Sequence, residues 1–327
     1  MSQRTIKLFV QYAIVFAAAI VTNFAVPRLA PGNAIDYLIP PEQSGKLSPA
    51  EHRRLLHMYG LDAGTWTQFR RYIVGLVHGD LGVSIRYGRP VRELLLARLP
   101  WTFALIGLSI LIGGVLGTAL GFRSAWNRGS GRDARTMAAI LCIDALPPFF
   151  VGMLLILVFS IGLHWFPVLT QFQPRTSNPW ATLRGAPRRM ALPLATLVIA
   201  STGPVYLAAR SALVGELSED YVVMAEAKGL SERHVRRHAR RNAYGPVVTV
   251  VLLALGTVVA GATVIETVFS YPGLGRLTYD SVLARDYPAL QAVFLLLALT
   301  VMTANLLSDL LYPLLDPRFR QSVGRPI

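Results

Sequence analysis

The sequence predicts an all-α polytopic membrane protein with six transmembrane helices, and three observations lead to this prediction. Of the 327 residues, 53% are hydrophobic and only 15% are charged. The apolar residues are concentrated in runs of about twenty, the length that an α-helix needs to cross the hydrocarbon core of a bilayer. Lys and Arg gather in alternate segments between these runs, as the charge rule for membrane proteins requires.

The first apolar run, Leu8–Val26, is too long for a signal peptide, whose apolar region covers roughly 7–15 residues. A long polar segment follows it and ends at Pro100. We therefore divide the chain into residues 1–100, the first helix and a long external loop, residues 101–315, a core of five transmembrane helices, and residues 316–327, a tail. The predicted core helices are Trp101–Phe122, Met137–Leu163, Met190–Leu213, Tyr244–Phe269 and Ala289–Tyr312.

Prolines and glycines mark where these spans bend or pack closely. Pro147 and Pro148 interrupt the third span, and Pro193 and Pro204 lie in the fourth. Proline removes a backbone donor and kinks a helix, which a membrane tolerates only where neighbouring groups satisfy the freed carbonyls. In the fifth span, Gly256 and Gly261 are suited to close packing against another helix.

The distribution of positive charge sets the orientation. The two termini, the loop after the second span and the loop after the fourth together carry fifteen Lys or Arg, whereas the two shorter outer loops carry six. The charge rule therefore places both termini in the cytoplasm. The net charge of +14 would suggest nucleic acid as the partner of a soluble protein. No nucleic-acid-binding motif accompanies it here, so it indicates basic loops facing anionic lipid.

The cytoplasmic loop 214–243 has an unusual pattern for a connecting segment. Ser218 is the expected N-cap of a short helix, Gly229 ends that helix, and Ser231 caps a second, arginine-rich helix. Ala225 lies four residues before Gly229, so both lie on one face and leave a shallow flank. An aromatic anchor, Tyr221, lies one turn earlier. Such a helix is suited to a groove of another protein.

This loop resembles the "EAA" loop of importer-type ABC permeases. In that family the loop docks into the ATPase subunit and transmits its movement to the membrane helices. A basic loop that only obeys the charge rule would explain the arginines but not the whole pattern. That pattern comprises Asp220-Tyr221, Ala225, Ala227-Lys228-Gly229-Leu230, His238-Ala239 and Arg241-Asn242-Ala243. The resemblance implies that the ATPase contacts are Tyr221, Ala225, Glu226, Ala227, Lys228, Gly229, His238 and Asn242.

Other motifs resemble the peptide and nickel subgroup of these permeases. They are Gly79-Asp80-Leu81-Gly82-x-Ser84, the phrase Glu266-x-Val268-Phe269-x-x-Pro272-Gly273-Leu274-Gly275, and Arg285-Asp286-Tyr287-Pro288 with Gln291. In isolation, the Gly79–Gly82 turn is too short and too poor in ligands to bind calcium or phosphate, so we interpret it as structural.

The resemblance implies a type I ABC importer permease of the bacterial inner membrane. The expected partners are a second, homologous permease, two cytoplasmic ATPase subunits or domains and an external substrate-binding protein. Peptides are the expected cargo, with nickel complexes or other small solutes of the same family as the alternative.

The chain has no signature of an energy source or a catalytic centre. A phosphate-binding loop needs Lys followed by Ser or Thr after a glycine-rich run, but Lys7 and Lys46 precede Leu, and Lys228 precedes Gly. ATP and magnesium are therefore expected on separate ATPase subunits, and this chain is expected to be non-catalytic. It also shows no metal-ligand spacing around His164, no His-Glu-x-x-His and no Gly-x-Ser-x-Gly.

Ionisable residues inside predicted spans are candidates for function. Asp144 either faces the substrate pathway or pairs with a polar group between helices. Glu266 either lines the outer vestibule or, as we favour, binds the amides of the adjacent turn. Asp309 is predicted to pair with Arg210 because both lie near the cytoplasmic ends of their spans. The alternative function is a channel or ion-coupled carrier that uses the three acids as a relay.

Overall fold

The structure is a computed structural model that describes residues 3–29, 50, 62–168, 170 and 179–315. The described side chains exclude those of residues 3–7, 26–29, 179–184, 255–260, 304 and 307–315. The described part is built from helices, with one isolated antiparallel bridge between Val83 and Pro90. The predicted all-α class is therefore confirmed.

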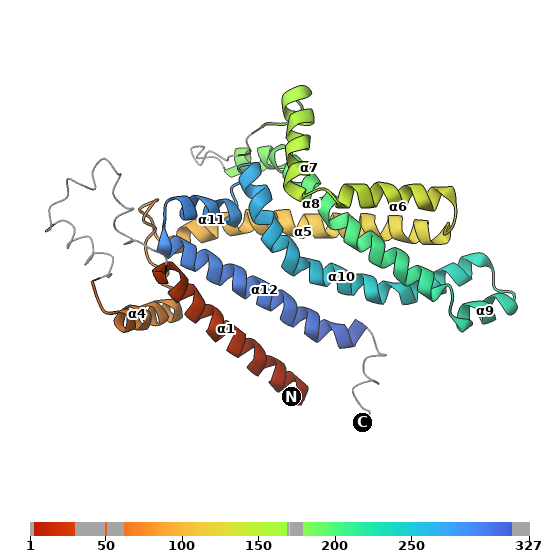
Figure 1. Cartoon of the computed structure of the whole chain (residues 1–327), viewed down its shortest axis with the longest axis horizontal. Coiled ribbons are helices and arrows are strands. Elements are labelled where there is room, and N and C mark those ends of the chain that lie inside the picture. Colours follow the sequence, from red (N-terminus) through yellow and green to blue (C-terminus); the bar gives the residue numbers. More distant parts are fainter. Residues whose placement is uncertain (1–2, 30–49, 51–61, 169, 171–178, 316–327) are drawn as a thin grey trace. The chain divides into compact units, whose positions relative to one another are not determined.

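Figure 1 shows the helices, which range from short connecting helices to helices of more than thirty residues. In chain order they are α1 (Gln3–Leu29), α4 (Thr65–His78), α5 (Val91–Trp126), α6 (Gly131–Asp144), α7 (Pro148–Leu155), the π-helix η1 (Ile156–Gly162), α8 (Pro179–Glu216), α9 (Asp220–Ala227), α10 (Glu232–Val268), α11 (Leu274–Leu283) and α12 (Tyr287–Leu315).

Among the described residues, three segments are long and apolar enough to cross a membrane: Leu8–Ala25, Val91–Trp126 and Gly185–Glu216. A fourth is the pair α6 and α7–η1, which is bent by 94° at the predicted proline break. Part of α10 and part of α12 lack described side chains, so the number of six spans stays a prediction.

Several helices extend beyond their predicted spans, and α5 and α8 gain long N-terminal extensions. Helix α5 begins at Val91 instead of Trp101, and α8 begins at Pro179 instead of Met190. Both extensions contain charged residues, and hydropathy marks only the apolar part of a helix. The loops expected before these spans are correspondingly shorter.

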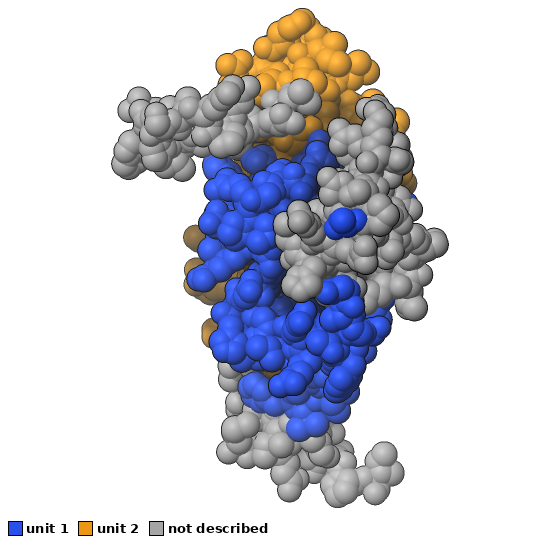
Figure 2. Space-filling view, turned by 90° about the vertical axis from the view of Figure 1, so that its left-hand side faces the viewer, with its two compact units in different colours: residues 1–102, 272–302 blue, residues 103–271, 303–327 orange. Residues whose placement is uncertain are grey.

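The chain forms two compact units, coloured separately in Figure 2. Unit 1 comprises residues 1–102 and 272–302, and unit 2 comprises residues 103–271 and 303–327. The boundary falls inside α5 and α12. The predicted N-terminal part, residues 1–100, lies in unit 1, which also takes residues 272–302.

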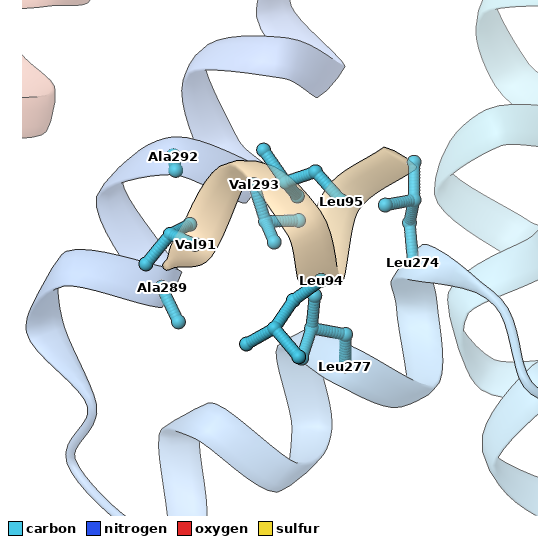
Figure 3. Packing of buried hydrophobic residues seen from close by; sticks show 8 residues of the cluster. All are labelled: Val91, Leu94, Leu95, Leu274, Leu277, Ala289, Ala292 and Val293. Atoms are coloured by element: carbon cyan, nitrogen blue, oxygen red, sulfur yellow. The ribbon is translucent and has the colours of Figure 1, made fainter. Parts of the chain in front are cut away.

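Unit 1 has a core where the first turns of α5 meet α11 and α12 (Figure 3). Val91, Leu277 and Val293 are fully buried there. Burying an aliphatic side chain of this size stabilises a fold by about 1.5–3 kcal/mol, so these contacts hold the three helices together. The remaining cluster members are Leu94, Leu95, Leu274, Ala289 and Ala292.

The glycine-rich turn beside this core is structural, as predicted. Gly79 ends α4 with φ +72° and Gly82 has φ +79°, in the left-handed region that favours glycine. The Asp80 carboxylate accepts the Gly82 N–H at 2.9 Å. The acidic residue therefore fixes the turn itself.

Asp286 joins the motif that ends at Ser84 to the motif that begins at Arg285. It is fully buried, its Oδ2 accepts from the Ser84 hydroxyl and from the Arg86 N–H at 3.2 Å, and its Oδ1 accepts the Ala289 N–H at 3.3 Å. It therefore caps α12 and fastens residues 84–86 to it.

We expect Asp286→Ala to lower the free energy of unfolding by about 2–3 kcal/mol, since it removes a helix cap and leaves buried donors without an acceptor. Thermal unfolding of the purified chain in detergent measures this loss. Asp286→Asn, which keeps one side-chain acceptor, should lose clearly less. Equal losses for the two substitutions would contradict the capping role.

Unit 2 depends on a close approach of α5 to α8 that sequence reasoning missed. A Cβ atom at Gly117 would lie 2.8 Å from the Thr202 carbonyl oxygen, and one at Gly121 would lie 2.6 Å from that of Tyr206. Both distances are below van der Waals contact, so only glycine fits. The four-residue spacing is the small-residue pattern typical of packed membrane helices.

Candidate functional site

The loop 214–243 folds as predicted into a short helix, a glycine break and a basic helix. Helix α9 covers Asp220–Ala227, and α10 begins at Glu232 after its N-cap Ser231. The predicted cap of α9 is wrong: Glu219 occupies the N-cap position. The Ser218 hydroxyl donates instead to the Val214 carbonyl at 3.2 Å. A serine side chain can bond in this way to the carbonyl four residues before it, at the end of α8.

Gly229 closes α9 in a left-handed conformation with φ +76°. The Leu230 N–H donates to the Ala225 carbonyl at 3.2 Å and the Gly229 N–H donates to the Glu226 carbonyl at 2.9 Å. These two bonds form a Schellman motif, which satisfies the last carbonyls of a helix. Ala225 and Gly229 therefore belong to one helix terminus, which fixes the direction in which the chain leaves α9.

Tyr221 connects α9 to the helices on both sides. Its hydroxyl donates to Glu216 Oε2 at 2.6 Å, at the end of α8, and also hydrogen-bonds to Asn242 of α10. Burial and the bond to Glu216 raise the pKa of Tyr221 to about 12, so it stays protonated. The predicted interface anchor is thus engaged within the chain, where it positions α9.

The exposed side of α9 carries apolar residues. Val222 is buried and attaches the helix to unit 2, whereas Val223 is 60% exposed, Met224 is 58% exposed and Leu230 is 37% exposed. We call Val223, Met224, Ala227 and Leu230 the α9 outer face. Glu226 and Lys228 are exposed beside it. The resemblance did not point to Val223 or Met224. The sequence feature that could have revealed them is an eight-residue helix with more apolar residues than it can bury.

The start of α10 is amphipathic. Val235, Ala239 and Ala243 recur every four residues and are buried in unit 2, so this face fixes the helix. His238 and Asn242 are exposed.

Arg236 pairs with Glu232 and lies 4.7 Å from the centre of the Trp126 ring. The basic face lines a surface cleft of about 640 Å³, formed by Glu232, Arg233, Arg236, Arg237, Arg240, Arg241 and Tyr244.

Arg210 pairs with Asp133, an acid that sequence reasoning did not select. Its Nε and Nη2 donate to the two oxygens of Asp133 at 2.9 and 2.7 Å. Asp133 is buried in the first turn of α6 and also accepts from Ser124 of α5, whose hydroxyl lies 2.7 Å from that of Tyr206. This bidentate pair joins α5, α6 and α8. The predicted partner Asp309 lies among the side chains that the structure does not describe.

The two acids proposed for the substrate pathway lie in different environments. Glu266 is fully buried and its backbone carbonyl accepts the Tyr271 N–H at 2.7 Å in the adjacent turn. That bond involves the backbone of Glu266, so both alternatives for its side chain stay predictions. Asp144 is exposed at the last residue of α6.

Helices that are long and apolar enough to cross a membrane, together with the exposed apolar face of the short helix α9, define a polytopic membrane protein. Residues 102–321 match the family described as the inner membrane component of binding-protein-dependent transport systems. The chain belongs to this family and is a multi-pass inner membrane component.

Relatives align over nearly the whole chain. The di/tripeptide transport system permease protein DppB of Pseudomonas aeruginosa is 35% identical over 321 residues, which cover 93% of this chain and 95% of the relative. The oligopeptide transport system permease protein AppB of Bacillus subtilis is 33% identical, covering 91% and 93%. The glutathione transport system permease protein GsiC of Salmonella paratyphi A is 36% identical, covering 91% and 92%.

Proposed function

We propose that this chain forms half of the translocation pathway of an ATP-driven importer for di- or oligopeptides. The observation that carries the proposal is the α9 outer face, an exposed apolar helix held rigidly between α8 and α10, in a chain whose full-length relatives are named as peptide permeases. A stand-alone carrier has no need of such a docking helix.

The proposed assembly contains a second, homologous permease, two ATPase subunits or domains and an external binding protein. ATP and magnesium bind to the ATPase subunits, and this chain is non-catalytic. Both termini face the cytoplasm, because the basic loops that include α9 and the start of α10 lie on that side.

The geometry of the loop supports mechanical coupling. Tyr221 links α9 to Glu216 and Asn242, and Val222 is buried beneath it. A force on α9 can therefore be transmitted through the Tyr221 bonds to the ends of α8 and α10. ATP binding then shifts an equilibrium between inward-open and outward-open states of the helices, which is allosteric coupling between two distant sites.

Purification and reconstitution test this function. The tagged chain should co-purify from detergent with an ATPase and a second permease, and the reconstituted complex with its binding protein should import a labelled dipeptide only with ATP. Uptake of a nickel complex with no dipeptide uptake would identify the alternative cargo. Uptake driven by membrane potential without ATP would overturn the importer and favour the carrier.

A further inference from the structure

Asp144 lies at the end of α6, where the chain turns by 94° into α7 (Figure 1). Its side chain is exposed. Within the part of the chain that the structure describes, it has no hydrogen-bond or ion-pair partner. An unpaired charge inside a membrane protein is costly and does not face lipid hydrocarbon.

Two independent measures place this carboxylate near the middle of the membrane. Asp144 follows the cytoplasmic Arg132 by twelve residues of α6, which at 1.5 Å per residue is about 18 Å, against a hydrocarbon core about 30 Å thick. Asp144 also contacts Gly203, near the middle of the apolar part of α8, Gly185–Glu216. The carboxylate is therefore far from both membrane surfaces.

The contact with α8 holds the carboxylate in place. A Cβ atom at Gly203 would lie 2.3 Å from Asp144 Oδ1 and 2.7 Å from its Cγ. The carboxylate thus lies directly against the α8 backbone, in space that any other residue at position 203 would occupy.

The local field at this position is negative from two sources. The C-terminal end of a helix carries a partial negative charge, which disfavours an acid and favours a cation there. Asp144 adds a full charge at the C-terminal end of α6. The low dielectric of the membrane strengthens both contributions. This arrangement is unfavourable by itself and becomes favourable when a cation is bound.

We propose that Asp144 forms a subsite for the cationic group of the transported solute, which is the terminal ammonium group if the cargo is a peptide. The proposal rests on the importer function above. The competing occupant is a cationic side chain of the second permease.

Transport kinetics of the reconstituted complex test the subsite. Asp144→Asn should raise the KM for a dipeptide about tenfold or more, because it removes a charge-assisted hydrogen bond. Asp144→Glu should retain most of the affinity, and Asp62→Asn, which changes an exposed acid outside the spans, should have no effect. The subunit composition of all three variants should match that of the native complex.

Cys142 offers a readout that does not need transport. It is the only cysteine of the chain, is exposed, and precedes Asp144 by two residues. Cationic methanethiosulfonate reagents should modify it faster than anionic ones, and Asp144→Asn should reduce this preference severalfold. Mass spectrometry of the Cys142 peptide measures both rates.

In the transport experiment, an unchanged KM in Asp144→Asn, or loss of the second permease from that variant, would overturn the subsite. In the labelling experiment, it would be overturned if Cys142 reacted with neither reagent, or if Asp144→Asn left the charge preference of Cys142 unchanged. Failure of the importer itself is seen separately, as absence of ATP-dependent uptake by the native complex.

Discussion

Asp133→Ala is expected to lower the free energy of unfolding by about 3–5 kcal/mol, the usual result of removing one partner of a buried ion pair. Asp133 and Arg210 are only 6% and 23% exposed, and both oxygens of Asp133 accept from the guanidinium. The substitution leaves the arginine charge buried and the Ser124 hydroxyl without this acceptor. Thermal unfolding in detergent and the yield of monodisperse protein measure the loss.

A surface pair provides the matched control. Arg89 and Glu93 form an ion pair with side chains 65% and 55% exposed, and such pairs contribute at most about 1 kcal/mol. Glu93→Gln should therefore be nearly neutral. The double variant Asp133→Ala with Arg210→Met should be more stable than Asp133→Ala alone, because no unpaired charge remains. A neutral Asp133→Ala would show that the pair has no structural role.

This ion pair marks the limit of what the sequence could predict. Position along a span suggested that Arg210 needs an acidic partner, and Asp133 is one such partner. Asp133 could not be selected from the sequence, because it is 77 residues from Arg210 in the chain and only the packing of α6 on α8 brings them together. The third span was predicted to begin at Met137, whereas α6 begins at Gly131 and contains Asp133 in its first turn.

Local patterns were more informative than long-range ones. Gly229 needed a positive φ and Ser231 preceded a helix, and both expectations depend only on neighbouring residues. The motif that contains Asp286 was recognised, but the structural role of Asp286 could not be inferred. Its hydrogen-bond partner Ser84 lies 202 residues away in the chain. Hydropathy located the apolar centres of α5 and α8 but not their N-terminal extensions, which contain charged residues.

The motif indicated where the candidate site lies in the chain but not which of its side chains are exposed. Sequence reasoning assigned Tyr221 to the interface, since an aromatic residue at a helix start is a common anchor. Its hydroxyl bonds to Glu216 and Asn242, and the contact of Tyr221 with an ATPase stays a prediction. Which apolar residues of α9 face inward depends on how the helix packs on unit 2, and a helix of eight residues has too few turns to show that periodicity.

Met224→Glu is expected to abolish ATPase co-purification and ATP-driven uptake while the chain stays folded. Met224 is 58% exposed, so an acid there costs the isolated chain little. Within a docked interface it would bury a charge without a partner, and central interface residues contribute about 2 kcal/mol or more to binding, which is roughly a thirtyfold loss of affinity. Pull-down with quantitative mass spectrometry measures the ratio of ATPase to permease.

The matched control changes a comparable residue elsewhere. Leu283 of α11 is apolar and 64% exposed, and it lies outside the cytoplasmic loop. Leu283→Glu should therefore retain the ATPase. Tyr221→Phe separates positioning from contact, because it keeps the ring and removes the bond to Glu216; we expect the ATPase to remain bound while uptake per ATP hydrolysed falls. If Met224→Glu and Leu283→Glu retained the ATPase equally, the α9 outer face would not be the docking surface.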